Sequence, residues 1–261
     1  MSLTTIIPVH SVAGDFEKYF ENALESVRSQ KEKIDKVMIV RCPCPDVKSV
    51  LESYDFKGLE VEIVENNSGK DFIRQINFAV DKVDTEYFSY LEFDDEYSMN
   101  WYKNVKQYIQ AYNDVPLFLN LIVDTDTEGK FAGFSNEPVW ALNFSEELGY
   151  LDIETLNSYP NFSTSGMVMK TDVFKTIGRF KNLKLSFMYE LMLRVLHNGY
   201  KIMTIPKIGY KHVNSRPGSM FFKYKNDPET QLTPDEAKFW METAKKEYFF
   251  NFDRNIQYEV A

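Results

Sequence analysis

Short apolar segments rich in β-branched residues alternate with amphipathic segments over the first 96 residues, and this order strongly restricts the possible folds. The segments predicted as strands are Thr4–Val9, Val37–Val40, Val61–Val64 and a fourth that begins at Tyr87. Between them, apolar side chains recur at helical spacing, namely Phe16, Tyr19, Phe20, Ala23, Leu24 and Val27, then Val47, Val50, Leu51 and Tyr54, then Phe72, Ile73, Ile76, Ala79 and Val80. A βαβαβαβ order predicts a mainly parallel sheet with helices on both faces, whose ligands bind at the carboxyl ends of the strands.

The fourth predicted strand ends in a cluster of acidic residues. Residues Tyr87–Glu96 read YFSYLEFDDE, so Glu92, Asp94, Asp95 and Glu96 follow an apolar run with no cation nearby in the sequence. Crowded carboxylates repel one another, which favours a divalent ion or a basic group that neutralises them. Such oxygen ligands suit Mg²⁺ or Mn²⁺, which proteins often hold together with substrate phosphates. We therefore expect a nucleotide diphosphate ligand; a solvated acidic turn is the alternative.

The pattern is less regular beyond this cluster. Helices are predicted over Trp101–Tyr112, Thr171–Ile177 and Phe187–His197, and strands over Leu117–Val123, Ser163–Lys170, Lys201–Pro206 and Ile208–Val213. A polar loop is expected around Gly129 and Gly133, and Pro138–Pro160 keeps no steady period, which is typical of irregular packing. Thr233-Pro234-Asp235-Glu236 is a capping box that predicts a helix through about Phe250. These patterns divide the chain into residues 1–96, 97–219 and a helical extension over 220–261.

Composition excludes several classes of protein. The chain has 261 residues, of which 44% are hydrophobic, and a formal net charge of -9; it can bury a substantial core and is not broadly attracted to nucleic acid or anionic lipid. No stretch approaches a membrane-spanning length, and the first nine residues lack the basic region of a signal peptide. Cys42 and Cys44 are too close for an easy disulfide and too few for a zinc site. We therefore expect a cytoplasmic protein.

Four motifs, taken in their order and spacing, resemble a family-2 glycosyltransferase of the GT-A fold. They are the first strand Thr5–His10 with the helix residues Ala23–Val27 and Gln30; Gly69 followed by Arg74 and Gln75; the acidic motif Leu91-Glu92-Phe93-Asp94-Asp95; and Gly166–Lys170, Gly178-Arg179-Phe180, Leu191–Arg194 and Gly199-Tyr200. The resemblance covers most of Thr4–Ser219. It implies one GT-A domain with a donor half over residues 1–96 and an acceptor-side half over residues 97–219.

The resemblance also implies a metal-dependent, inverting transfer of a sugar from a nucleotide diphosphate donor to a hydroxyl acceptor. Asp95 and Asp94 would hold Mn²⁺ or Mg²⁺, with His212 as a further ligand, because a divalent ion offsets the charge of the leaving diphosphate. The residues expected to contact the donor, by default a UDP-sugar, are Pro8, Val9, His10, Arg41, Gly69, Lys70, Arg74, Glu92 and Asp94. A solvated helix face is the alternative for Lys70 and Arg74, and a structural role is the alternative for His212.

An inverting transfer needs a general base on the acceptor side, and Glu190 is the candidate. It lies among Phe187, Leu191 and Leu193 on a predicted helix, so a buried carboxylate with a raised pKa fits the pattern. The alternative is an exposed ion pair between Glu190 and Arg194 at helical spacing.

Two positions depart from the family pattern. Arg41 and Cys42 stand where an Asp pair that contacts the nucleotide base is usual, which leaves the donor base open. Phe187 and Met188 stand where a Glu-Asp pair often marks the catalytic helix. A second hypothesis follows from these missing acids: a catalytically weakened GT-A module with a structural or sugar-binding role.

The acceptor class stays open at this stage and includes a glycan, a lipid-linked glycan, a protein and a hydroxylated DNA base. A DNA acceptor would require basic residues to gather on one face, and the candidates are Lys181, Lys184, Lys201, Lys207, Lys211, Arg216, Lys223 and Lys225. A nucleotidyltransferase is a third hypothesis, disfavoured because no glycine-rich loop with a lysine follows the first strand. The oligomeric state does not follow from the sequence.

Overall fold

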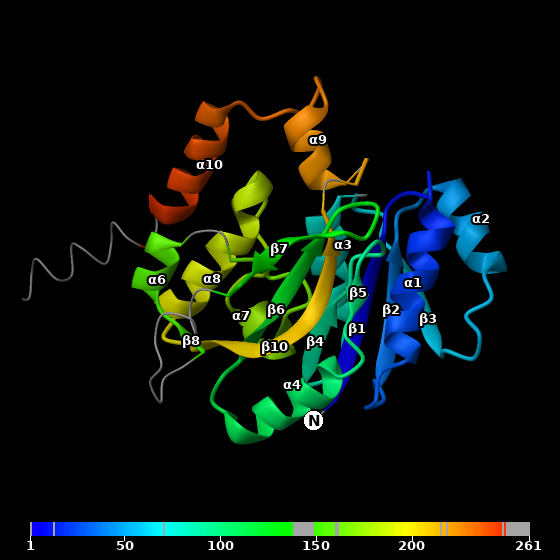
Figure 1. Cartoon of the computed structure of the whole chain (residues 1–261), viewed down its shortest axis with the longest axis horizontal. Helices are drawn as coiled ribbons and strands as arrows, with labels where there is room; N and C mark the ends of the chain where they lie inside the picture. Colours follow the sequence, from blue (N-terminus) through cyan, green and yellow to red (C-terminus); the bar gives the residue numbers. More distant parts are fainter. Residues whose placement is uncertain are drawn as a thin grey trace, which may run out of the picture.

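The alternating segments of the first 96 residues form one edge of a large mixed sheet (Figure 1). The computed structural model describes residues 2–12, 14–69, 71–137, 149–159, 162–214, 216, 217, 219–246 and 248. Within these residues the strands are β1 (Leu3–Val9), β2 (Lys36–Arg41), β3 (Val61–Glu65), β4 (Tyr87–Tyr90), β5 (Glu96–Tyr97), β6 (Leu117–Thr125), β7 (Phe131–Ser135), β8 (Tyr150–Leu151), β9 (Val168–Lys170) and β10 (Ile202–Val213). Their order is β3-β2-β1-β4-β9-β6-β10-β5, with β7 paired to β6 and β8 paired to β10.

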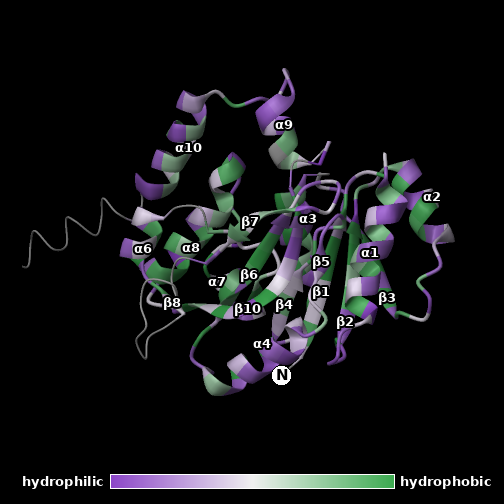
Figure 2. Ribbon diagram, viewed as in Figure 1, coloured by the Kyte–Doolittle hydropathy of each residue, from purple (hydrophilic) through white to green (hydrophobic). Residues whose placement is uncertain are grey.

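The helices cover both faces of this sheet. They are α1 (Phe16–Arg28), α2 (Pro45–Ser53), α3 (Phe72–Lys82), α4 (Trp101–Ala111), α6 (Ile153–Ser158), α7 (Thr171–Thr176), α8 (Phe187–His197), α9 (Met220–Asn226) and α10 (Pro234–Lys246), with a 3₁₀ turn at Lys184–Ser186. Figure 2 shows mostly hydrophobic strands between helices that also carry polar residues. The α/β fold with flanking helices predicted from the sequence is confirmed.

Strand β1 lies between β2 and β4 within residues 1–96 and is buried along its whole length. It pairs in parallel with β2, where Ile6 lies opposite Met38, and with β4, where Ile6 lies opposite Tyr90. Because successive side chains point to opposite faces of a strand, Ile6 and Ile7 enter two separate cores. Helices α1, α2 and α4 pack on the core that contains Ile7, and helices α3, α7 and α8 pack on the one that contains Ile6.

Residues 97–219 differ from the sequence expectations in several strands. The polar loop expected around Gly133 instead contains β7, which pairs antiparallel with β6. Only Val168–Lys170 of the expected strand Ser163–Lys170 is paired, because Gly166 turns the chain with a left-handed φ of +68° and packs against the ring of Tyr210. The two strands expected on either side of Pro206 form the single strand β10 with two register shifts, since a proline cannot donate to the ladder.

Part of the expected irregular segment Pro138–Pro160 lies outside the described residues. Its described part contains β8 and helix α6, which begins after Asp152, whose side chain accepts a hydrogen bond from the Thr155 amide (2.6 Å). In the C-terminal extension, the expected capping box is present. The Thr233 amide donates to Glu236 Oε2 (2.8 Å), and the Glu236 amide donates to Thr233 Oγ1 (3.2 Å).

The expectation that Cys42 and Cys44 stay unpaired is wrong. The two residues form a disulfide, with their Cα atoms 5.3 Å apart. The extended backbone of Cys44 at the start of α2 brings the second thiol back toward the first, a geometry that spacing in the sequence does not reveal. The two cysteines therefore no longer support the expectation of a cytoplasmic protein. No helix in the described part of the chain is long and apolar enough to span a bilayer.

Candidate functional site

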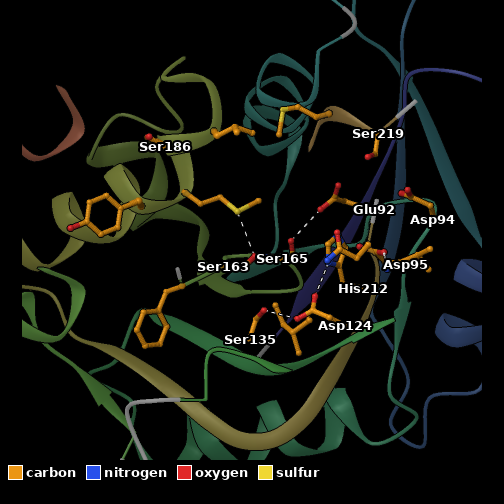
Figure 3. Close-up of a pocket in the computed structure, with 18 of the residues that line it drawn as sticks. Glu92, Asp94, Asp95, Asp124, Ser135, Ser163, Ser165, Ser186, His212 and Ser219 are labelled. Carbon is orange, nitrogen blue, oxygen red and sulfur yellow. Dashed lines mark hydrogen bonds and ion pairs between the residues drawn. The ribbon is translucent and has the colours of Figure 1, made fainter. Parts of the chain in front are cut away.

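The acidic cluster continues from β4 beyond its pairing with β1. The Leu91 amide still donates to the Ile6 carbonyl (2.9 Å), and the Asp95 amide then donates to the Glu92 carbonyl (3.0 Å), which closes a turn. This turn places the carboxylates of Glu92, Asp94 and Asp95 at the carboxyl edge of the sheet (Figure 3). Asp94 and Asp95 are only 8% and 1% exposed, so the alternative of a solvated acidic turn is wrong.

Asp95 has one satisfied oxygen and one that has no partner. Its Oδ1 accepts a hydrogen bond from the Val213 amide on β10 (2.8 Å), whereas its Oδ2 is buried without a hydrogen-bond partner. Burial raises the pKa of Asp95 well above its ordinary value, and the neighbouring carboxylates of Asp94 and Glu92 raise it further against the opposing effect of His212. A positive charge next to Oδ2 would stabilise the ionised carboxylate of Asp95.

Glu92 faces the same region from the other side of the turn. Ser165 Oγ donates to Glu92 Oε1 (3.2 Å), and the Glu92 amide donates to the Tyr210 hydroxyl (3.1 Å). Burial and then the nearby Asp94 carboxylate raise the pKa of Glu92 to about 7.

His212 reaches the cluster from β10, which is separated from β4 by two strands of the sheet. Its Nδ1 lies 2.9 Å from Oδ1 of Asp124 on β6. Burial alone would lower the pKa of His212, but the Asp95 carboxylate and the hydrogen bond with Asp124 outweigh it and raise the pKa to about 10. Since Asp124 holds Nδ1, the other ring nitrogen is the one left for a ligand.

Arg216 follows β10 and forms an ion pair with Asp94. Its guanidinium carbon lies 5.0 Å from the ring centre of Phe93 and 5.9 Å from that of Tyr19, so the side chain is held over two aromatic rings. The sequence analysis counted Arg216 only among the basic residues of a possible DNA-binding face. Its pairing with Asp94 depends on the path of the chain after β10, and no local pattern in the sequence predicts this pairing.

The cluster as a whole has more negative than positive side chains. The carboxylates of Glu92, Asp94, Asp95 and Asp124 face two cationic groups. Nevertheless, no group of three or more His, Cys, Asp or Glu side chains in the described residues is placed so that it could hold a metal ion by itself. The predicted ligands Asp94, Asp95 and His212 are thus brought together at one edge of the sheet but do not form a closed metal cage.

The residues predicted to contact the nucleotide lie at the neighbouring strand ends. Val9 at the end of β1 pairs in register with Arg41 at the end of β2, which in turn pairs with Glu65 of β3. Arg41 forms an ion pair with Glu65, and its Nη1 donates to the Cys42 carbonyl (3.1 Å). Next in the chain after Pro8 and Val9, His10 lies with its ring centre 5.4 Å from that of Phe93.

The glycine segment before α3 lies at the same edge. The Gly69 carbonyl accepts from Asn66 Nδ2 (3.0 Å), and Arg74 Nη1 donates to the Ser68 carbonyl (3.1 Å). The Arg74 side chain is 58% exposed, so its guanidinium remains accessible to a ligand. Lys70, the other predicted donor contact in this segment, lies outside the described residues.

A cavity of about 460 Å³ opens beside the acidic cluster and extends away from these nucleotide-side residues. Its volume is within the range of roughly 300–1,000 Å³ that is usual for ligand sites. Figure 3 shows the carboxylates and His212 on one side, Ser186 on the opposite side, and Ser163 and Ser165 between them. The lining consists of Glu92, Asp94, Asp95, Ile122, Asp124, Ser135, Phe162, Ser163, Ser165, Leu185, Ser186, Met188, Tyr189, His212, Val213, Asn214, Ser219, Met220, Leu232, Ala237, Trp240 and Met241.

Glu190, the residue predicted as general base, does not line this cavity. It is 1% exposed and forms a bidentate ion pair with Arg194, with Nε–Oε1 and Nη2–Oε2 distances of 3.0 and 2.8 Å. Lys181 Nζ lies 3.1 Å from Glu190 Oε1, and the Tyr248 hydroxyl donates to the same oxygen. The ion pair with Arg194 that the sequence analysis considered is therefore present, but it is buried rather than exposed.

Met188 lies where the resemblance expects an acid, and its side chain does line the cavity. Ser163 Oγ lies 3.5 Å from the Met188 sulfur. The wall formed by α8 thus presents a thioether at the place where the resemblance expects a carboxylate.

The fold and the position of this cluster define an α/β protein with a ligand site at the carboxyl edge of its sheet. The family model described as Glycosyl transferase family 2 matches residues 4–178, which is more than half of the chain. The chain therefore belongs to glycosyl transferase family 2, and the resemblance seen in its motifs is confirmed.

Solved structures of TarS from S. aureus share the fold. The complex of TarS residues 1–349 with UDP-GlcNAc superimposes with a TM-score of 0.63 at 16% sequence identity, over 94% of this chain and 65% of that one. A structure of TarS 1–349 gives a TM-score of 0.61 at 16% identity, over 98% of this chain and 73% of that one. A further TarS structure gives a TM-score of 0.58 at 19% identity, over 95% of this chain and 43% of that one. The chain thus spans slightly less than two thirds of the first of these structures. A search of curated proteins finds no match.

Proposed function

We propose that the protein transfers a sugar from a nucleotide diphosphate donor to a hydroxyl group, with inversion and with the help of Mn²⁺ or Mg²⁺. Family membership supports the reaction class. The default donor is a UDP-sugar, and the TarS complex makes UDP-GlcNAc the first compound to test.

The buried, unpartnered Oδ2 of Asp95 is the observation that carries this proposal. A carboxylate oxygen without a partner is unfavourable in the interior, and here three further carboxylates surround it. A divalent ion fits this donor set, because proteins often hold Mg²⁺ through one or two carboxylates and leave the remaining positions to water and substrate phosphates. Asp95 and Asp94 would hold the ion, and His212 would contribute the ring nitrogen that Asp124 does not occupy, after the charge of the ion at Asp95 has displaced the proton from that nitrogen.

When bound, the ion supplies positive charge for the diphosphate that leaves with the bond to the sugar. The protein residues prepare the rest of the site. Asp124 fixes the ring of His212, while Arg216 supplies a further guanidinium at the cluster. The ends of β1, β2 and β3, with Arg41 and Arg74, provide the surface for the nucleotide.

Glu92 is the carboxylate that fits the proton acceptor in this cavity. It lines the cavity, Ser165 donates to one of its oxygens, and burial together with the Asp94 carboxylate raises its pKa, which favours a proton acceptor. Glu190 does not line the cavity, and its oxygens are occupied by Arg194, Lys181 and Tyr248.

Thermal unfolding with a panel of nucleotide diphosphates and UDP-sugars, each with and without Mn²⁺, tests the donor site. A ligand that binds only the folded protein raises the unfolding midpoint by mass action. We expect a Mn²⁺-dependent rise with one donor that is lost in Asp95→Asn. A rise that is the same in wild type and Asp95→Asn would contradict the proposed site.

Met188 favours a second function, a module that binds the donor but turns it over slowly. Release of UDP from the donor separates the two functions. A catalytic protein releases UDP at a rate that falls in Glu92→Gln, whereas a binding module shows the same donor-dependent midpoint without release.

A further inference from the structure

The C-terminal extension forms the part of the cavity wall that lies farthest along the chain from the acidic motif. Helix α10 contributes Ala237, Trp240 and Met241, and α9 contributes Met220. In Figure 1, α9 and α10 lie on the same side of the molecule as α8, whose first turn also lines the cavity. The extension is therefore part of a ligand site as well as a covering of the core.

Helix α10 is fixed in this position at both ends. The capping box between Thr233 and Glu236 defines its start. Near its end, Ala244 and Tyr248 are 1% and 2% exposed and belong to the core below α8. Tyr248 also donates to Glu190, so the buried ion pair of α8 anchors the segment that follows α10.

The chemistry of the lining matches a carbohydrate. Serine hydroxyls from five places in the chain alternate with flat or flexible apolar side chains; the serines are Ser135, Ser163, Ser165, Ser186 and Ser219. A sugar ring offers the same combination, with hydroxyl groups around its rim and an apolar face that packs on an aromatic ring. Ser135, Ser163 and Ser165 already donate within the protein, so they would act toward a sugar as acceptors. The aromatic side chains of the wall are Phe162, Tyr189 and Trp240. Phe162 and Tyr189 are only 5% and 2% exposed, whereas Trp240 is half-buried, so Trp240 has surface left to serve as such a platform.

The charge of the lining favours a neutral ligand. Among the described residues, no lysine or arginine lines this cavity, whereas four carboxylates do. Several basic residues of the possible DNA-binding face are instead engaged by carboxylates, namely Lys181 by Glu190, Lys201 by Asp114, Lys211 by Glu96 and Arg216 by Asp94. Away from the acidic cluster, the described lining of this cavity carries no charged side chain, so nothing there would offset the charge of a polyanionic acceptor.

A second cavity of about 520 Å³ continues from the first. The two share Leu185, Asn214, Leu232 and Ala237, and the second is otherwise lined by Phe222, Tyr224, Lys225, Gln231 and Pro234. A ligand that fills the first cavity can therefore extend between α9 and the start of α10.

We infer that α9 and α10 build the acceptor site for a neutral glycan, with Trp240 as the platform for the sugar next to the acidic cluster and the second cavity as the place of a further sugar unit. This inference rests on the proposed function, because it assumes that the acidic cluster holds the donor.

Binding of neutral oligosaccharides provides the test. The probes are a glycan array of uncharged di- to tetrasaccharides, with phosphorylated glycans and single-stranded DNA as the anionic arms, applied to the full chain with UDP and Mn²⁺. Wild type should bind a neutral glycan, more tightly for longer chains. Trp240→Ala should weaken this binding by about tenfold or more, the order expected for loss of an aromatic platform, and Trp240→Phe should restore part of it.

Two further variants control for folding. Lys238 precedes the aromatic residues Phe239 and Trp240 on α10, is exposed and does not line either cavity, so Lys238→Ala should leave glycan binding unchanged. Ala237 is exposed and lines both cavities. Ala237→Trp should therefore obstruct their junction without disturbing the core and reduce the binding of tri- and tetrasaccharides most.

The results separate this inference from the proposed function. If no neutral glycan binds, if Trp240→Ala and Ala237→Trp bind as wild type does, or if only the anionic probes bind, the inference is overturned. The Mn²⁺-dependent thermal shift with a donor, measured on the same preparations, reports on the proposed function alone, and Trp240→Ala should preserve that shift.

Discussion

Glu190 and Asp95 are both buried carboxylates with 1% exposure, yet their surroundings are opposite. Every oxygen of Glu190 has a cationic or hydroxyl partner from Arg194, Lys181 or Tyr248. Asp95 has one backbone partner and one oxygen without any. The comparison teaches that burial alone does not distinguish a structural acid from a functional one. The distinction is whether the protein itself compensates the charge.

The largest expected effect is on stability, at Glu190, where the protein compensates the charge and which we call the compensated site. Glu190→Ala leaves Arg194 as a buried cation without its partner and should lower the free energy of unfolding by about 3–5 kcal/mol. Denaturant unfolding measures this change. The control is Glu52→Ala, which removes an exposed i,i+4 pair with Lys48 and should cost about 0.5 kcal/mol or less. A loss below about 1 kcal/mol for Glu190→Ala would show that its ion pair does not stabilise the fold.

The second largest effect is expected on activity, at Asp95, whose Oδ2 has no partner and which we call the uncompensated site. Asp95→Asn keeps an oxygen for the Val213 amide but removes the charge, so donor turnover should fall by on the order of 10²–10³-fold. The thermal midpoint without ligands should not fall, because the removed charge had no partner at Oδ2. UDP release and thermal unfolding on the same sample measure both. A clear destabilisation with full activity would reverse the assignment of the two sites.

A smaller loss of stability is expected from a change at Tyr248, which contacts the compensated site. Tyr248→Phe removes only the hydroxyl that donates to Glu190 and should lower the free energy of unfolding by about 1.5–3 kcal/mol, as expected for a hydrogen bond to a charged group. Donor binding should stay unchanged, since Tyr248 does not line the cavity. Denaturant unfolding and the donor-dependent thermal shift are the two measurements, and loss of the shift would link α10 to the donor site.

The smallest effect concerns a third carboxylate, well paired but at the surface. Hydrogen bonds from Lys57 and Tyr54, together with Arg28, lower the pKa of Glu21 from 4.5 to about 2. Because the pKa is lower in the folded protein, Glu21 stabilises the fold above about pH 4.5, and this contribution disappears as the pH falls toward 2. The side chain is 32% exposed, so screening limits the contribution to about 1 kcal/mol or less.

Glu21→Gln should therefore flatten the fall in stability between pH 4.5 and 2 while leaving stability at lower pH unchanged. Denaturant midpoints over this pH range provide the measurement. An unchanged pH profile in the variant would mean that these hydrogen bonds are too well solvated to affect folding.

The fold of residues 1–96 could be predicted closely from the sequence because its signals are local. The β-branched run Thr4–Val9 and the helical spacing from Phe16 to Val27 each specify an element without reference to the rest of the chain. The acidic motif could also be located, since carboxylates at the end of a strand in such a fold lie at the ligand edge.

The acceptor side depends on contacts between distant segments, which local patterns do not record. The helical spacing of Glu190 and Arg194 was recognised, but the burial of the pair comes from Tyr248, 58 residues further on. The pairing of Arg216 with Asp94 likewise joins residues 122 positions apart. The helix α9 and the cavity wall formed by α10 were missed because amphipathic spacing does not tell whether an apolar side chain meets a core or a ligand.

The contacts between the end of β10 and the turn after β4 have a consequence for the order of folding. The Val213–Asp95 and Tyr210–Glu92 hydrogen bonds each close a loop of 118 residues, although β10 does not pair directly with β4 in the sheet. Contacts that close long loops form slowly, because the chain loses the entropy of loop closure before the new contacts stabilise it. Residues 1–96 can thus acquire their local structure well before the carboxylates are enclosed. A nascent chain that has not yet made β10 carries the acidic motif in an open, hydrated form, so the proposed retention of a donor and its ion would mark a finished molecule.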